Sequence, residues 1–285
     1  QLCIEVYGLQ DELSSDVPLS EITLKCNPLF RYGINFSEDE LEDRLKADTM
    51  KEFISYAVGC MFGRYSLDKP GLILANQGEK LADYLRQVPD PSFLPDKDNA
   101  IPILDGDWFG DDITERFKQF LRVTFGEEHY SENLVFIEEA IGRDIRSYFL
   151  KDFYGEHLKM YKKRPIYWLF SSPKGSFNVL IYMHRYNKDT VSVILNSYLK
   201  EYQRKLEAAK TAQERISISA GSTPRDKTAA LKEIERLNKV LDELRAYERD
   251  IIYPLAANPI EIDLDDGVKV NYAKFGNALA KIPGL

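Results

Sequence analysis

The chain has 285 residues, of which 44% are hydrophobic and 29% charged, and its formal net charge is −8. This composition fits one large globular domain or two modest ones and excludes a low-complexity tail. No run of 18 apolar residues occurs, which excludes a membrane-spanning helix. Three distant cysteines without a pattern argue against a disulfide framework and for a reducing, cytoplasmic setting. Three histidines without ligand spacing argue against a zinc site.

The N-terminal part of the chain predicts a lead-in followed by a helix. Residues 1–47 are expected to be irregular, with a short strand at 22–24. Ser37 is followed by three acidic residues, which is the pattern of a capped helix N-terminus. Apolar residues spaced by three and four then predict an amphipathic helix over 48–65. Repeated Pro, Gly and Asp predict loops over 66–110.

The middle of the chain predicts helices and then a hairpin. Helical periodicity returns over 112–125 and 131–162, with a break expected near Gly142 or Gly155. Beyond that point, two runs of aromatic and β-branched residues flank a Ser-Ser-Pro-Lys-Gly turn, which predicts a β-hairpin over 165–183.

Two long helices are expected next. Apolar residues step by three or four over 190–215, and a small polar turn follows over 216–222. Thr223 has the pattern of the cap of a second helix, which we expect Pro254 to end. Two helices of similar length joined by a short loop predict an antiparallel helical hairpin, each helix spanning roughly 35–40 Å.

The C-terminal segment predicts a second β-hairpin. Apolar residues alternate over 260–270 around an Asp-Asp-Gly turn. The nearby acids Asp263, Asp265 and Asp266 do not fit an EF-hand, because the glycine falls at position five of the loop rather than six, and we predict no metal site.

Together these patterns predict a mainly α fold with small β-hairpins (α+β) in four segments. They are a lead-in (1–47), a mixed helical domain carrying the hairpin 165–183 (48–189), an antiparallel helical hairpin (190–253), and a C-terminal β-hairpin and tail (254–285).

Charge is distributed unevenly along the chain. Residues 1–140 hold 13 basic and 28 acidic residues, whereas residues 141–190 hold 10 basic and four acidic residues and residues 191–285 are nearly neutral. Cations beside aromatic residues are typical of phosphate contact with base stacking, although a helix end also gathers cations through its dipole. The candidate DNA-binding residues of this basic block are Lys159, Lys162, Lys163, Arg164, Tyr167, Trp168, Lys174 and Arg185.

The motifs of common catalytic sites are absent. No two glycines have G-x-G spacing, so neither a dinucleotide fingerprint nor a glycine-rich methyl-donor loop is present. No P-loop, G-x-S-x-G or H-E-x-x-H motif occurs. The run Asn27-Pro28-Leu29-Phe30 differs from the N-P-P-Y/F loop of amino-methyltransferases at its third residue, and a turn is the simpler interpretation. We therefore predict no catalytic residue in this chain.

Four blocks carry a resemblance to a known family. They are 4–13 (IEVYGLQDEL), 49–76 (TMKEFISYAVGCMFGRYSLDKPGLILAN), 163–186 (KRPIYWLFSSPKGSFNVLIYMHRY) and 262–272 (IDLDDGVKVNY). The chain resembles the C-terminal region of the PglX-type adenine-specific DNA methyltransferases of BREX phage-defence systems, relatives of the type IIG restriction-modification methylases. The resemblance implies that the chain is a piece of a longer enzyme and begins where the methylase core ends.

The resemblance also implies cofactors and partners. In that family the methyl-donor and N-P-P-Y loops lie upstream, so S-adenosylmethionine is implied for the parent enzyme and no cofactor for this chain. Double-stranded DNA, the upstream methyltransferase domain and other BREX components are the implied partners, with no membrane. Our leading hypothesis is a non-catalytic module that assists DNA binding or complex assembly. The alternatives are a protein-interaction module without DNA contact and an independent enzyme using the C-terminal aspartates.

Overall fold

The structure is a computed structural model that describes residues 2–12, 16–18 and 21–285. The remaining residues of the expected lead-in lie outside the described part. The α-helices are Leu2–Val6 (α1), Pro28–Tyr32 (α2), Glu38–Met61 (α3), Leu81–Gln87 (α4), Ile113–Phe125 (α5), Tyr130–Ile141 (α6), Ile145–Tyr148 (α7), Tyr154–Met160 (α8), Thr190–Val193 (α9), Lys200–Ile218 (α10), Pro224–Tyr247 (α11), Tyr253–Ala257 (α12) and Gly267–Ala273 (α13). The strands are Ile101–Pro102 (β1), Tyr167–Ser171 (β2) and Asn178–Tyr182 (β3). Among these described residues, no helix combines the length and the apolar character needed to cross a bilayer.

The three strands form one small antiparallel sheet in the order β1-β3-β2. The predicted hairpin is confirmed, with Tyr167 opposite Tyr182 and Ser171 opposite Asn178. The sequence did not predict β1, because two residues are too short to show a pattern. The C-terminal segment covers the free edge of β2, where the Ala280 N–H donates to the Leu169 carbonyl at 2.8 Å.

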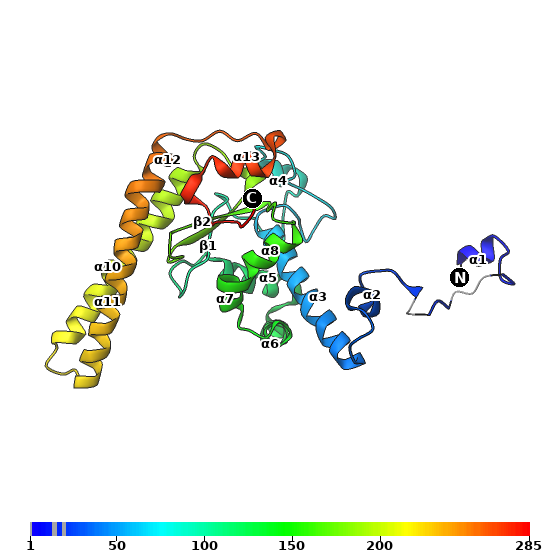
Figure 1. Cartoon of the computed structure of the whole chain (residues 1–285), viewed down its shortest axis with the longest axis horizontal. Coiled ribbons are helices and arrows are strands. Elements are labelled where there is room, and N and C mark those ends of the chain that lie inside the picture. Colours follow the sequence, from blue (N-terminus) through cyan, green and yellow to red (C-terminus); the bar gives the residue numbers. More distant parts are fainter. Residues whose placement is uncertain (1, 13–15, 19–20) are drawn as a thin grey trace.

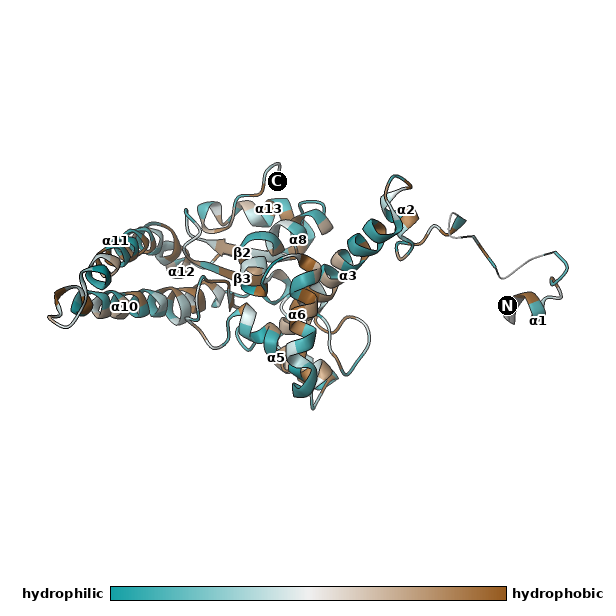
Figure 2. Cartoon of the chain, turned by 90° about the horizontal axis from the view of Figure 1, so that it is seen from below, coloured by the Kyte–Doolittle hydropathy of each residue, from teal (hydrophilic) through white to brown (hydrophobic). Residues whose placement is uncertain are grey.

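The hydrophobic core surrounds this sheet. Its largest fully buried side chains include Trp168 and Phe170 of β2, Tyr182 of β3, and Phe117 and Phe120 of α5. Figure 1 shows α3, α5, α7 and α8 beside the strands and α13 above them, and Figure 2 shows hydrophobic residues in both labelled strands. The sheet is therefore an interior element rather than an exposed surface.

The helix predicted after Ser37 is confirmed but is longer than expected. Ser37 and Glu40 form a capping box, in which the Glu40 N–H donates to Ser37 Oγ at 3.3 Å and the Ser37 N–H donates to the Glu40 carboxylate at 2.9 Å. The helix runs from this box to Met61. The strand expected at 22–24 is wrong, because no strand of the described residues pairs with that segment, which instead leads into α2.

The predicted break at Gly142 is confirmed, since this glycine ends α6 with a φ of 69°. Gly155 breaks nothing and lies inside α8. The irregularity on that side is a π-helical turn at Phe149–Phe153, which joins α7 to α8.

The antiparallel helical hairpin is confirmed, and we call α10 and α11 the arm. Both views show the two helices side by side, projecting away from the sheet (Figures 1 and 2). Thr223 and Asp226 form the capping box of α11 with Pro224 in its first turn. The connecting turn is shorter than expected, because α10 continues to Ile218.

Pro254 does not end the second helix, which corrects the sequence-based expectation. A π-helical turn at Glu248–Ile252 precedes it, and Pro254 lies in the first turn of α12. The helical run continues without a break through this turn, and the π-helical turn, which interrupts the regular i→i−4 hydrogen bonding, accommodates the proline.

The β-hairpin expected over 260–270 is also wrong, because α13 occupies its second half. The Asn271 side chain fixes this helix. Its Oδ1 accepts the Asp263 N–H at 3.1 Å, and its amide donates to the Gly267 carbonyl at 3.0 Å. Val268 and Tyr272 are spaced for one face of this helix, and a short alternating run does not reveal that spacing. The fold is mainly α with a small antiparallel sheet, whereas the four-segment division remains a prediction.

Candidate nucleic-acid interface

Four exposed cations lie where α8 ends: Lys159, Lys162, Lys163 and Arg164, which we call the cationic corner. The turn closes when the Lys163 N–H donates to the Leu158 carbonyl at 2.7 Å and the Arg164 N–H donates to the Tyr161 carbonyl at 2.9 Å. Lys162 and Lys163 have φ values of 51° and 61°. Each residue other than glycine in this left-handed region costs about 1–2 kcal/mol. Two consecutive lysines therefore occupy positions in this turn where glycine would have less backbone strain.

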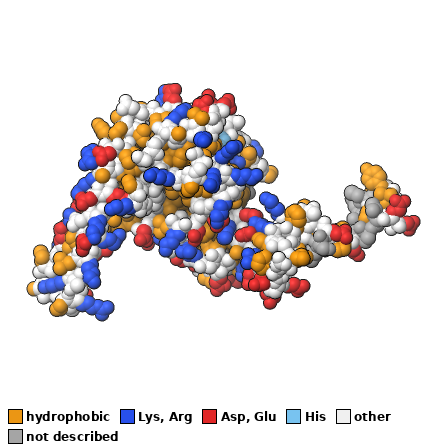
Figure 3. Space-filling model, in the orientation of Figure 1, with side chains coloured by type: hydrophobic (Ala, Val, Ile, Leu, Met, Phe, Trp, Pro, Cys, Tyr) orange, Lys and Arg blue, Asp and Glu red, His pale blue; other side chains and the backbone are white. Residues whose placement is uncertain are grey.

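Most of these cations have no internal partner. Lys159 forms an ion pair with Glu156 at 3.1 Å. In contrast, no described carboxylate lies within ion-pair distance of Lys162, Lys163 or Arg164. Figure 3 shows Lys and Arg side chains gathered over the centre of the body in this view. Exposed cations without a partner remain available for an external anion.

Three predicted site residues are buried, which corrects their assignment to the interface. Tyr167 is 2% exposed, Trp168 is fully buried and Arg185 is 5% exposed. The Trp168 ring packs edge-on against Phe275 at 5.5 Å, and Arg185 Nη1 donates to the Phe62 carbonyl at 3.2 Å. Strand β3 pairs with one edge of β2, the C-terminal segment covers the other edge, and Tyr272 of α13 packs against Trp168. The aromatic half of the predicted interface is therefore core.

Arg185 belongs to a partly buried polar cluster beside Tyr198, just before α10, which we call the root of the arm. The Tyr198 hydroxyl donates to Asp98 at 3.2 Å and is also 3.4 Å from Asp111. Burial, followed by the charge of Asp96, raises the pKa of Asp98 to about 7. Burial lowers the pKa of Arg185, and the charges of Asp96 and Asp98 oppose that effect. This cluster joins the loops that carry Asp98 and Asp111 to the helical turn just before α10, and both carboxylates are partly exposed.

Lys174 is exposed at the tip of the β2–β3 turn, and the arm holds this turn in place. The Glu243 carboxylate of α11 is 9% exposed and accepts the Ser172 hydroxyl at 2.6 Å, the Lys174 N–H at 2.7 Å and the Ser176 hydroxyl at 2.5 Å. The Lys174 ammonium has no ion-pair partner among the described residues. Sequence reasoning missed Glu243, since a glutamate in a charged helix carries no sign of burial.

Sequence reasoning also missed Arg64, which follows α3. Its Nη1 donates to the Tyr182 hydroxyl at 2.9 Å, and its guanidinium lies 5.5 Å from the Tyr65 ring centroid. Burial raises the pKa of Tyr161, and the positive charge of Arg64 opposes that effect. A half-buried guanidinium without a described carboxylate partner thus lies within electrostatic range of the turn that carries the cationic corner.

His157 lies beneath the corner and is structural. Its Nε2 accepts the Tyr167 N–H at 3.2 Å, and its ring packs 4.7 Å from that of Tyr161. Burial, followed by the Arg64 charge, lowers its pKa to about 3. The imidazole is therefore neutral near pH 7.

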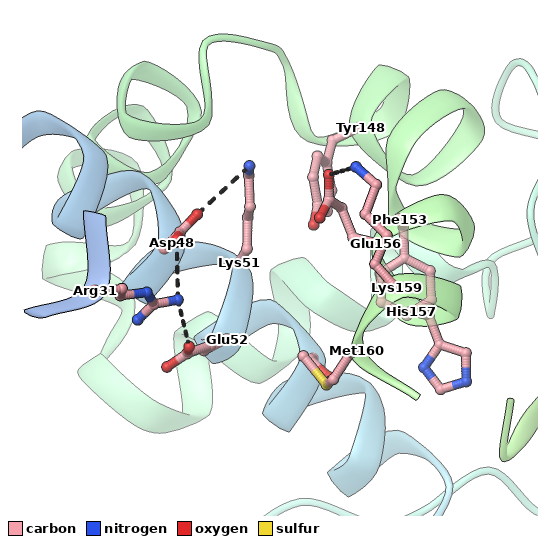
Figure 4. A pocket seen from close by; sticks show the side chains of 11 residues that line it. Arg31, Asp48, Lys51, Glu52, Tyr148, Phe153, Glu156, His157, Lys159 and Met160 are labelled. Atoms are coloured by element: carbon pink, nitrogen blue, oxygen red, sulfur yellow. Dashed lines mark hydrogen bonds and ion pairs between the residues drawn. The ribbon is translucent and has the colours of Figure 1, made fainter. Parts of the chain in front are cut away.

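A crevice of about 270 Å³ lies between α3 and α8, next to Lys159 (Figure 4). Arg31 on its rim pairs with Asp48 and Glu52, each at 2.9 Å, and Lys51 lies 3.9 Å from Asp48. Figure 4 shows the His157 ring directed away from these charges. Since the rim cations already have carboxylate partners, the crevice is poorly suited to an anion.

The remaining candidate motifs have structural roles. Asn27 is the N-cap of α2, where its side-chain oxygen accepts the Leu29 N–H at 3.1 Å, and Phe30 is 53% exposed. Asp263 accepts the Asp265 N–H at 3.0 Å in the turn before α13. Within the described ranges, no group of three His, Cys, Asp or Glu side chains is arranged to hold a metal ion.

Comparison with curated proteins then decides the resemblance. "Adenine-specific methyltransferase BrxX" of Escherichia coli O9:H4 (strain HS) is 40% identical over 300 aligned residues, which cover 99% of this chain. "Adenine-specific methyltransferase PglX" of Lacticaseibacillus casei (strain Zhang) is 39% identical over 289 residues, or 96% of this chain. The resemblance to PglX-type methyltransferases is confirmed. The chain spans 24% and 22% of the lengths of these two relatives. No family model matches the chain.

Proposed function

We propose that this chain is a non-catalytic C-terminal module of a PglX-type adenine-specific DNA methyltransferase of a BREX phage-defence system. It holds duplex DNA through the cationic corner and Lys174. Two methyltransferases named for adenine match it across nearly its full length, yet it spans less than a quarter of each. The glycine-rich methyl-donor motif is absent from its sequence. The upstream part of the parent enzyme would bind S-adenosylmethionine.

The proposal of DNA contact rests on the exposure, the missing ion pairs and the backbone strain of the cationic corner. Lys162, Lys163 and Arg164 are exposed, have no described carboxylate partner, and follow one another in a turn whose two lysines occupy strained backbone conformations. Local strain retained at surface positions is typical of functional sites. An acidic chain that nevertheless leaves these cations unpaired has a local surface suited to a phosphate backbone.

The buried aromatics limit what this contact can read. Tyr167 and Trp168 are enclosed in the core, so they cannot stack on a base. Lysine and arginine contacts to phosphates fix the position of a duplex but carry no direct sequence information. The module therefore positions DNA without selecting its sequence, and recognition of the target adenine is left to the rest of the parent enzyme.

A charge reversal tests this proposal. Lys162, Lys163 and Arg164 are each changed to Glu, and the matched control reverses three paired arm cations, Arg204, Arg236 and Lys239. Binding of a 30-bp duplex is measured by fluorescence anisotropy over a salt series. We expect the corner variant to lose at least tenfold in affinity and about 2.7 units of log–log salt slope, since each phosphate contact contributes about 0.9.

The control should retain the wild-type salt slope. Equal losses in both variants would show that only net charge matters and would overturn the proposal. Unchanged DNA binding in the corner variant would favour the protein-interaction module, in which the corner faces an acidic partner.

A further inference from the structure

The basal and distal parts of the arm differ in how many of their lysines and arginines form ion pairs with carboxylates. In its basal part, taken together with the start of the π-helical turn that follows α11 (residues 200–209 and 233–250), each lysine and arginine lies within 4.0 Å of a carboxylate or is hydrogen-bonded to one. They are Lys200, Arg204, Lys205, Arg236, Lys239, Arg245 and Arg249. The basal part holds seven basic and eight acidic residues. Its cations are therefore neutralised on the arm itself.

The distal part, residues 210–232, has the opposite character. It holds five basic and two acidic residues. Lys210 pairs with Glu207 at 3.7 Å, and one of the two acids, Asp226, is occupied in the capping box of α11. The other four cations have no ion-pair partner in the described chain; they are Arg215, Arg225, Lys227 and Lys232. Figure 3 shows blue side chains at the tip of the arm.

Two of these cations flank a hollow on α11. Arg225 and Lys232 line a shallow depression of about 470 Å³ together with Pro224, Thr228 and Ala229. The two cations are seven residues apart, about 10 Å along the helix axis, which places them on the same face. The small side chains between them keep the surface concave.

We propose that this face of the distal arm is a second binding site for the phosphodiester backbone of duplex DNA, separate from the cationic corner. Unpaired Arg and Lys beside a hollow can contact phosphates and release their counterions. A protein partner is less well matched, because the hollow has no aromatic or large aliphatic side chain to act as an anchor. This site extends the proposed function and does not require the corner to bind.

The test compares two double variants of the 285-residue chain. Arg225→Ala with Lys232→Ala removes the two cations of the hollow, and Arg236→Ala with Lys239→Ala removes two paired cations of the same helix. The probe is a 30-bp duplex titrated from low salt upward, and circular dichroism checks that helicity is retained. We expect the first variant to lose about 1.8 units of salt slope and at least tenfold in affinity, while the control keeps the wild-type slope.

Each other outcome overturns the inference. Equal losses in the two variants would mean that net charge alone matters. If the Arg225→Ala, Lys232→Ala variant binds DNA like wild type, this face does not contact DNA, and an acidic protein becomes the better candidate for its partner. The corner charge reversal, measured in parallel, keeps the two proposals distinguishable. A loss in that variant alone supports the corner and overturns the arm site, whereas a loss in the arm variant alone does the reverse.

Discussion

The base and the tip of the arm are built on different physical principles. At the base, Leu237, Leu241 and Leu244 are buried, and Glu243 and Tyr247 hold the β2–β3 turn and the C-terminal segment through hydrogen bonds. Over 210–232, Ala230 is the one buried residue, while Ile218 is 82% exposed. The base therefore supplies the stability of the arm, and the tip is free to present charge.

The largest expected difference in the free energy of unfolding is between truncation of a leucine at the base of the arm and truncation of a leucine at its tip. Leu244 is fully buried, so Leu244→Ala should lower the free energy of unfolding by about 3–4 kcal/mol through lost burial and cavity formation. Leu231 is 59% exposed, and Leu231→Ala should change it by less than about 0.5 kcal/mol. Urea denaturation measures both values. Similar values for the two variants would remove the distinction between base and tip.

Removal of the Glu243 carboxylate should cause the next largest loss of stability. Glu243→Ala leaves two hydroxyls and the Lys174 N–H without their acceptor, and we expect a loss of about 2–3 kcal/mol. Asp242, whose side chain is 76% exposed, provides the control, and Asp242→Ala should be nearly neutral. If Glu243→Ala unfolds at the wild-type urea concentration, the arm is not anchored to the turn in this way.

The root of the arm should respond to pH. The pKa of Asp98 is about 7 in the folded chain, above its value of about 3.9 in an unfolded chain, so the folded state holds this proton more tightly. Its contribution to stability is present below pH 4 and is lost as the pH rises to 7. The stability of Asp98→Asn relative to wild type should therefore rise over pH 4–7, by at most about 1.4 kcal/mol per pH unit.

Comparing Asp98→Asn with wild type also cancels the pH dependence of stability that His157 contributes. The pKa of His157 is lowered to about 3, so its contribution to stability changes with pH in the opposite direction and cancels between the two proteins. A difference between wild type and variant that stays constant over pH 4–7 would contradict the assignment.

The sequence allowed prediction of the elements whose signals are local. The capping boxes at Ser37 and Thr223, the Pro-Gly turn of the hairpin and the helical stripes of the arm depend on nearby residues, and each is confirmed. The second hairpin was wrong because the choice between strand and helix depended on Asn271 and on packing against the sheet. The sequence also could not show that Lys162 is exposed and Arg185 is buried, because segments distant in the chain decide which side chains are covered.

Substitution of the corner lysines should change stability little, and it tests most directly whether exposed, unpaired lysines in a strained turn contact DNA phosphates. Glycine accepts the φ values of Lys162 and Lys163 without strain, which relieves about 1–2 kcal/mol at each position and costs about 0.5–1 kcal/mol of chain entropy at each. The double glycine variant should therefore be at least as stable as wild type, by about 1 kcal/mol.

The decisive measurement is the salt dependence of duplex binding by Lys162→Gly with Lys163→Gly. Contact of both lysines with phosphates predicts a log–log slope lower by about 1.8 in a protein that is at least as stable as wild type. A variant that is equally stable and binds DNA with the wild-type slope would contradict it, because the lysines would then have been retained for some other reason.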